Sequence, residues 1–239
     1  MKYYLNILLL ILFGCTSAQK PPTDPSFQKV IPGADAMNAS IIKPHKVRYK
    51  KIGGEMIYDL QKVERKGKEV YRLYVYFNDE NGAPDIMYFD VETLGYLGRT
   101  LGSGEDSKYL LDVDFQDGKF TGDLIPKNDS GYTPRTYDKT YPHGAFEPAV
   151  INYFISALPL KKGYKASIPV FDLNDGSQMY WSNIEVLKKE TIKANGKSYD
   201  TWKVLSKGIR EKTIWVTETH PYAIKMKTKG NPGTWLVID

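Results

Sequence analysis

The sequence predicts a mainly β fold: a strongly curved antiparallel sheet or open barrel with one amphipathic helix packed on its concave face. Two observations predict it. From residue 45 onward, short β-type segments alternate with turns such as Lys66-Gly67, Asp117-Gly118 and Asn195-Gly196, and Asn-Gly and Asp-Gly supply the positive φ angles of tight hairpins. Residues 146–158 instead carry apolar side chains at helical spacing.

Two segments indicate how the strands are oriented. Residues 109–116 alternate between the apolar set Tyr109, Leu111, Val113, Phe115 and the set Leu110, Asp112, Asp114, Gln116, which predicts one buried and one solvated face. Residues 70–77 carry rings on both faces. Because tyrosine has an apolar body and a polar tip, this favours a curved sheet whose second face is partly covered, although β-propensity alone explains the same composition.

The helix is predicted over residues 146–158, about three turns long. Val150, Ile151, Phe154 and Leu158 follow the helical period, and Pro148 suits the first turn, where its missing N–H is no loss. We therefore expect the apolar stripe of this helix to pack on the sheet.

The amino end has the pattern of a secretory signal over residues 1–14, since a basic residue precedes an apolar run that is too short to span a bilayer. Cys15, the only cysteine, follows Leu12-Phe13-Gly14. This resembles a lipobox, although Phe13 is larger than the residue usual there, and it predicts a lipid on Cys15 that attaches the protein to a membrane. Cleavage after Ala18 is the alternative, giving a soluble periplasmic or secreted protein.

Residues 15–44 are expected to form a lipid-anchored flexible tether, because residues 19–33 contain four prolines. A plain disordered amino terminus has the same composition. Residues 45–239 are then expected to form a single curved β domain, exported to the cell envelope and held on the periplasmic face of the outer membrane.

Composition and motifs argue against several functions. The 33 basic and 28 acidic residues give a net charge of +5 with scattered lysines, so we expect no nucleic-acid partner. His45, His143 and His220 are far apart, so no metal site is expected. Asp112 with Asp114, or Asp138 with Glu147, are weak candidates for a glycosidase pair, and Asp79, Glu80 and Asp85 form an acidic turn without regular calcium-loop spacing.

No nucleophile elbow, phosphate loop or dinucleotide fingerprint occurs in the sequence. After Cys15 no thiol is left for a disulfide or a cysteine nucleophile. We therefore expect no catalytic residues, no cofactor and no enzymatic activity.

Two regions resemble each other, residues 67–96 and 196–222. Each has a Gly-Lys turn, strands and then a Glu-Thr-x-x-Tyr segment ending at Tyr96 or Tyr222. Duplication of a strand meander explains this, and so does independent use of similar hairpins.

The carboxyl half resembles an uncharacterised family of exported bacterial proteins, domain of unknown function 3108. The resemblance covers residues 140–239 and rests on the segments 149–158, 160–163, 186–190, 199–204, 213–217 and 225–230, with Asn195-Gly196 and Pro221. It implies a strongly curved, mostly antiparallel sheet around a helix, similar in outline to periplasmic carriers of lipid acyl chains. The family assigns no reaction.

The leading functional hypothesis is a non-enzymatic envelope lipoprotein that binds a lipid or other apolar ligand in the hollow of the sheet. The candidate ligand-binding residues are large rings on strands or on the helix: Tyr74, Tyr76, Phe154, Trp181 and Trp215. Each also fits a simple core role. The alternatives are an assembly module that binds another envelope protein by strand addition and, less favoured, a carbohydrate-active protein.

Overall fold

The computed structural model describes residues 24–78, 80, 83–104, 107–127, 131–173, 178–208, 211–231 and 233–239. The predicted signal (residues 1–14), the predicted lipid on Cys15 and the alternative cleavage after Ala18 lie outside these residues. Within them, no helix has both the length and the apolar character needed to cross a bilayer.

The described residues form one fifteen-stranded sheet and three short helices. The strands are β1 (Gln28–Lys29), β2 (His45–Lys51), β3 (Gly54–Arg65), β4 (Lys68–Phe77), β5 (Asp85–Asp90), β6 (Tyr96–Leu101), β7 (Tyr109–Gln116), β8 (Lys119–Pro126), β9 (Arg135–Thr140), β10 (Lys165–Asp172), β11 (Gln178–Ala194), β12 (Lys197–Lys207), β13 (Lys212–Val216), β14 (Ala223–Thr228) and β15 (Thr234–Val237). The helices are the 3-10 turns η1 (Ala39–Ile41) and η2 (Pro148–Val150) and the α-helix α1 (Ile151–Ser156).

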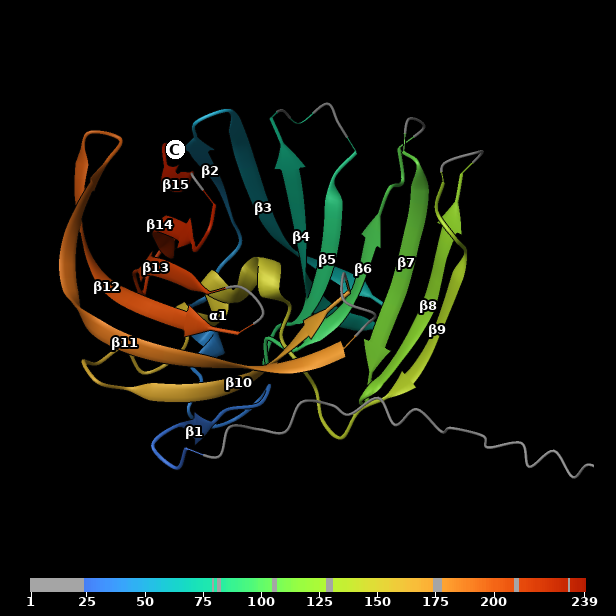
Figure 1. The fold of residues 1–239 in the computed structure, drawn as a ribbon, viewed down its shortest axis with the longest axis horizontal. Coiled ribbons are helices and arrows are strands. Elements are labelled where there is room, and N and C mark those ends of the chain that lie inside the picture. Colours follow the sequence, from blue (N-terminus) through green and yellow to red (C-terminus); the bar gives the residue numbers. More distant parts are fainter. Residues whose placement is uncertain are drawn as a thin grey trace, which may run out of the picture.

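The sheet consists of two antiparallel meanders, β2 to β9 and β10 to β15, joined where β15 pairs with β2. Figure 1 shows them on opposite sides of α1. The mainly β prediction is confirmed, but the sheet is mixed, because β1 pairs with β10 in parallel. Among the described residues, the edge strands β1 and β9 do not pair with each other, so the sheet is not closed.

Residues 24–44 differ from the flexible tether predicted for residues 15–44. Val30 and Ile42 are buried, the Val30 amide donates to the Ser167 carbonyl at 2.9 Å, and the Asn38 amide donates to the Ala157 carbonyl at 2.8 Å. The few apolar residues between the prolines thus bury against the sheet and α1, which outweighs the disordering effect of the prolines.

The helix is shorter than predicted and has no solvated face. In place of a helix over residues 146–158, η2 continues directly into the six-residue α1, and every side chain of α1 is buried. The prediction of an amphipathic helix is therefore wrong. The polar Asn152 and Ser156 are buried too, because the two meanders enclose α1 from both sides.

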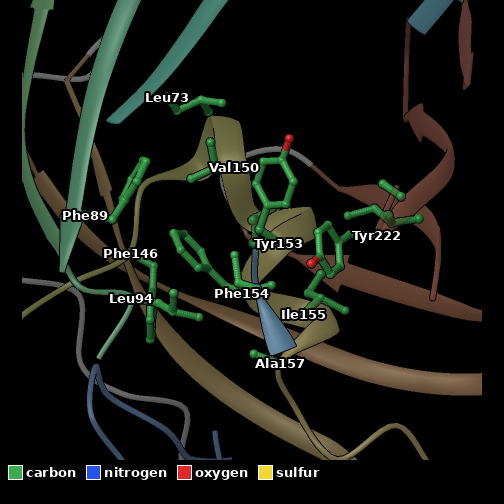
Figure 2. Close-up of a cluster of buried hydrophobic side chains, with 14 of the residues drawn as sticks. Leu73, Phe89, Leu94, Phe146, Val150, Tyr153, Phe154, Ile155, Ala157 and Tyr222 are labelled. Carbon is green, nitrogen blue, oxygen red and sulfur yellow. The ribbon is translucent and has the colours of Figure 1, made fainter. Parts of the chain in front are cut away.

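The buried side chains around α1 form the centre of the core. Figure 2 shows Phe154 of α1 near Phe146 and Phe89, with Tyr222 on the other side of the helix. The ring centroid of Phe154 lies 4.9 Å from that of Phe146 and 5.7 Å from that of Phe89. The helix thus fixes the spacing between the two meanders.

The segment just before η2 connects the meanders directly. The Tyr96 amide of β6 donates to the Ala145 carbonyl at 2.9 Å, and the Phe146 amide donates to the Pro169 carbonyl of β10 at 2.8 Å. The next residue, Glu147, is therefore placed between the two halves of the sheet.

Candidate functional site

A cavity of about 240 Å³ lies between the two meanders beside the start of η2. Strands β3 to β6 line it from one side, and β10 to β13 line it from the other. Its apolar lining includes Met56, Val75, Phe77, Met87, Ile151 and Val170. Phe77 is 62% exposed, so it marks the mouth of the cavity.

A buried ion cluster forms the polar wall. Arg99 Nε donates to Asp85 Oδ1 at 2.8 Å, its Nη2 donates to Asp85 Oδ2, and its Nη1 reaches Glu147 Oε1 at 3.4 Å. Asp85 is 6% exposed and Glu147 is 3% exposed. Buried charges are tolerated only when they are paired in this way.

Hydrogen bonds from two strands and from Glu147 itself hold the backbone next to Glu147. Glu147 caps η2, because its Oε2 accepts from the Ala149 amide. Tyr58 of β3 donates to the Ala149 carbonyl at 3.0 Å, and Lys212 Nζ of β13 donates to the Pro148 carbonyl at 2.9 Å. The carboxylate is thus fixed relative to both halves of the sheet.

The cluster shifts the titration of its members. Burial raises the pKa of Glu147 to about 7, although Arg99 acts in the opposite direction. Burial alone lowers the pKa of Arg99, but Glu147 and Asp85 outweigh it and raise that pKa above its ordinary value. Near neutral pH, Arg99 is therefore charged and Glu147 is poised between its two protonation states.

Two serines complete the polar lining. Ser182 Oγ and Ser206 Oγ lie 3.0 Å apart, and both residues are buried. The lining of the cavity therefore offers hydroxyl, guanidinium, ammonium and carboxylate groups among apolar side chains. Such a surface suits a small amphipathic molecule. Over the described ranges, no three or more His, Cys, Asp or Glu side chains are grouped so that they could hold a metal ion.

Comparison with known proteins places the chain in a family. The model of the family described as a protein of unknown function, DUF3108, matches residues 46–235. The chain belongs to this family. The resemblance predicted for residues 140–239 is confirmed, and the match extends through β2 to β9 as well.

Two further comparisons accompany the family match. No curated protein matches the chain. Among solved structures, the chain is similar to the crystal structure of a β-barrel-like protein of domain of unknown function DUF1849 from Brucella abortus, with 14% identity and a TM-score of 0.48. The similarity covers 81% of this DUF3108 chain and 94% of the other chain.

Three of the five ligand-binding residues predicted for this DUF3108 member do not line the cavity: Tyr74 and Tyr76 lie on the other face of the sheet, and Phe154 lies in the core. Tyr74 and Tyr76 alternate with the buried Leu73 and Val75, and their ring centroids lie 6.0 Å apart. They therefore lie on the face opposite to the cavity. Phe154 is part of the core beside Phe146.

The two predicted tryptophans lie in the carboxyl meander. Trp181 is half-buried, with its ring centroid 5.3 Å from that of His143. Trp215 is buried, and the ammonium groups of Lys203 and Lys225 lie 5.2 and 4.5 Å from its ring centroid. Among the described cavity-lining residues, none is one of the five, and their role in ligand binding stays a prediction.

Asp85, Arg99 and Glu147 were not predicted as a cluster from the sequence. Asp85 belonged to the acidic turn with Asp79 and Glu80, but it begins β5 and shares the inward face with Met87. Arg99 pairs with Met87, next to a register shift between Tyr88 and Phe89. The sequence signal for this cluster was a charged residue, such as Asp85, at a strand position where the alternation calls for an apolar side chain.

Two of the three histidines, which are far apart in the sequence, lie together in the fold. The ring centroids of His45 and His220 are 4.9 Å apart, and His45 Nδ1 lies 2.7 Å from the Lys43 carbonyl. Burial lowers the pKa of His45 to about 4. His45 is therefore neutral at neutral pH.

Glu147 and His45 are expected to give the stability of the protein opposite pH dependences. For Glu147, the folded pKa of about 7 exceeds the ordinary 4.5, so its contribution is full below pH 4.5 and is lost as the pH rises to about 7. For His45, the folded pKa of about 4 lies below the ordinary 6.5, so its contribution is present above pH 6.5 and is lost as the pH falls to about 4. Each shift corresponds to roughly 3 kcal/mol.

Urea unfolding at pH 4.5, 6 and 7.5 checks this expectation. Relative to the unmodified protein, Glu147→Gln gains about 2–3 kcal/mol of unfolding free energy as the pH rises across this range, and His45→Gln loses a similar amount. Differences between variant and parent cancel the titration of all other groups. Parallel curves for parent and variants would contradict the assigned shifts.

Proposed function

We propose that this protein binds an apolar or amphipathic ligand, such as a lipid or part of one, in the cavity between the two meanders. It would act as a non-enzymatic binding protein of the cell envelope. The observation that carries the proposal is the cavity itself, whose lining combines apolar side chains with paired charges and hydroxyl groups.

The size of the cavity limits the ligand. A protein cavity of about 150 Å³ lined by apolar side chains holds benzene, which has six heavy atoms. On that scale, a cavity of about 240 Å³ holds roughly ten heavy atoms. A short acyl chain would fill it, and a longer one would extend past Phe77 toward solvent.

The amino-terminal sequence supports a place in the envelope. The segment Leu12-Phe13-Gly14-Cys15 suits lipid attachment at Cys15, which would hold the protein on the periplasmic face of the outer membrane. The bend of the sheet around α1 (Figure 1) supports the further proposal that the fold is an open barrel whose hollow serves the ligand.

Native mass spectrometry of the chain, purified from a periplasm without detergent, tests the proposal. We expect a stoichiometric additional mass that disappears on solvent extraction, with the extract giving the class of ligand. A mass equal to that of the bare polypeptide, unchanged after incubation with fatty acids and fatty alcohols, would contradict ligand binding.

A further inference from the structure

The formal charges around the cavity already balance one another. Among the described residues that line it, Arg99 and Lys212 are positive, and Asp85 and Glu147 are negative. Arg99 pairs with both carboxylates, with Asp85 through two hydrogen bonds and with Glu147 at 3.4 Å. A ligand with a net charge would leave this buried site unbalanced, and an unpaired buried charge has a large desolvation cost. The balance therefore favours an uncharged ligand.

Two serines occupy strand positions where the alternation calls for apolar side chains. Ser182 of β11 lies two residues before the buried Ile184, and Ser206 of β12 lies two residues after the buried Val204. Because successive side chains of a strand point to opposite faces, both hydroxyl groups share the inward face with these apolar side chains. Both serines are buried and line the cavity. A few polar groups in a mostly apolar pocket typically orient a ligand.

The serine pair keeps hydrogen-bonding capacity for such a ligand. Ser182 Oγ lies 3.0 Å from Ser206 Oγ and donates to the Lys207 carbonyl at 3.3 Å. A hydroxyl group has one donor hydrogen and two acceptor lone pairs, so Ser206 can donate to Ser182 and still accept from a ligand hydroxyl. With its hydrogen turned toward a ligand oxygen, Ser206 can instead accept from Ser182. The pair therefore suits a hydroxyl or carbonyl group.

We infer that the ligand is an uncharged amphiphile whose hydroxyl or ester carbonyl group hydrogen-bonds to Ser206, as in a fatty alcohol or an acyl ester. The inference rests on the proposed function and names the ligand class. The apolar chain would lie against Met56, Met87 and Val170, which line the same cavity. The ligand would thus contact strands of both meanders.

Charged ligands suit this lining less well. A carboxylate or an ammonium group would add one unbalanced charge. A zwitterion has no net charge, but each of its two charges would need a partner inside the cavity. Arg99 is paired with two carboxylates, and Lys212 donates to the Pro148 carbonyl at 2.9 Å. A zwitterion would therefore have to displace existing contacts, whereas an uncharged head group would not.

Calorimetric titration of the purified chain with four eight-carbon ligands at pH 8 tests the charge preference. At this pH octanol is uncharged, octanoate is an anion, octylamine is a cation and 2-aminooctanoate is a zwitterion. The pKa of Glu147, about 7, lies below this pH, so the charges of the cavity balance. We expect octanol to bind at least about tenfold more tightly than each of the other three ligands.

The variant Ser206→Ala tests the hydrogen bond to the head group. We expect its octanol affinity to fall about fivefold, the usual effect of losing one hydrogen bond. Ser182 keeps the Lys207 carbonyl as its acceptor in this variant. The apolar ligand 1-chloroheptane is similar in length to octanol but has no hydroxyl group. It should bind the parent and Ser206→Ala equally, which would show that the cavity is intact.

The matched control is Ser167→Ala. Ser167 is a buried serine of β10 whose Oγ donates to Asn183 Oδ1 at 3.0 Å. It is not among the described residues that line the cavity. The same truncation at this position should therefore leave the octanol affinity of the parent unchanged.

The outcomes separate the inference from the proposed function. Octanol that binds no more tightly than octanoate, octylamine or 2-aminooctanoate would overturn the inference and leave the proposed function intact. So would an octanol affinity that Ser206→Ala leaves unchanged, that Ser167→Ala lowers equally, or that falls together with the 1-chloroheptane affinity. Binding of 1-chloroheptane without octanol binding would also overturn the inference alone. Failure of all five ligands to bind would overturn both.

Discussion

Replacing Arg99 with methionine is expected to lower the free energy of unfolding by about 3–5 kcal/mol, because it leaves two buried carboxyl groups without their cation. Asp85 and Glu147 are both almost fully buried, and both pair with this one guanidinium. Methionine keeps the length and much of the apolar stem of arginine. The loss of unfolding free energy would therefore come from the missing charge rather than from a large cavity.

Urea denaturation at pH 7.5 measures this loss. The control is Arg48→Met, since the ion pairs of Arg48 with Glu55 and Glu80 are partly exposed and longer, at 3.6 and 3.7 Å. We expect it to cost less than about 1 kcal/mol. Adding Asp85→Asn and Glu147→Gln to Arg99→Met should restore most of the stability. Equal losses for Arg48→Met and Arg99→Met would contradict the cluster.

Replacing Phe154 with alanine is expected to cost about 3–5 kcal/mol, the usual loss for a buried phenylalanine. Phe154 is 2% exposed and lies between Phe146 and Phe89, as Figure 2 shows. Because α1 separates the two meanders, the space left by the ring is enclosed on both sides and cannot easily collapse.

Phe77→Ala is the matched control for Phe154→Ala. Phe77 is 62% exposed, so the same truncation should change the unfolding free energy by about 0.5 kcal/mol or less. Phe77 also lines the mouth of the cavity, so its loss should weaken octanol binding while leaving the fold intact. Thermal melts of Phe154→Ala and Phe77→Ala measure the difference in stability. Similar losses in the two would contradict the central position of α1.

Local sequence patterns were sufficient for much of the fold. Lys66, Asp117 and Asn195 adopt positive φ angles of 53°, 50° and 46° before their glycines, as the hairpin turns required. The alternation in β7 is also observed, with Leu111, Val113 and Phe115 buried. These features depend on neighbours in the sequence, which is why local pattern is enough to predict them.

Features set by distant contacts were not predicted. Strand β1 has two residues, too few for a periodic signal, and it forms only against β10. The apolar spacing predicted an amphipathic helix, but the enclosing sheet also buries its polar residues Asn152 and Ser156. Residues far apart in the sequence meet here: Gln28 of β1 pairs with Ala166, and Ser156 Oγ donates to the Tyr222 carbonyl as well as to the nearby Asn152 carbonyl.

The candidate site depends on the same kind of contact. Ring residues such as Tyr74 were predicted as ligand-binding because aromatic side chains are common in binding sites. The residues that line the cavity instead depend on how β5 and β6 pair, and this pairing includes a register shift between Tyr88 and Phe89. Arg99 lies opposite Met87, next to that shift. Its position follows from strand pairing, which the sequence alone did not specify.

The central claim is that the cavity between the meanders is the ligand site, and methionine methyl NMR tests it most directly. Met56 and Met87 line the cavity, whereas Met37 and Met226 do not. With methyl-labelled methionine and added octanol, we predict saturable shifts of the Met56 and Met87 signals, with those of Met37 and Met226 unchanged. Shifts confined to Met37 or Met226, or no saturable shift at Met56 and Met87, would contradict the claim.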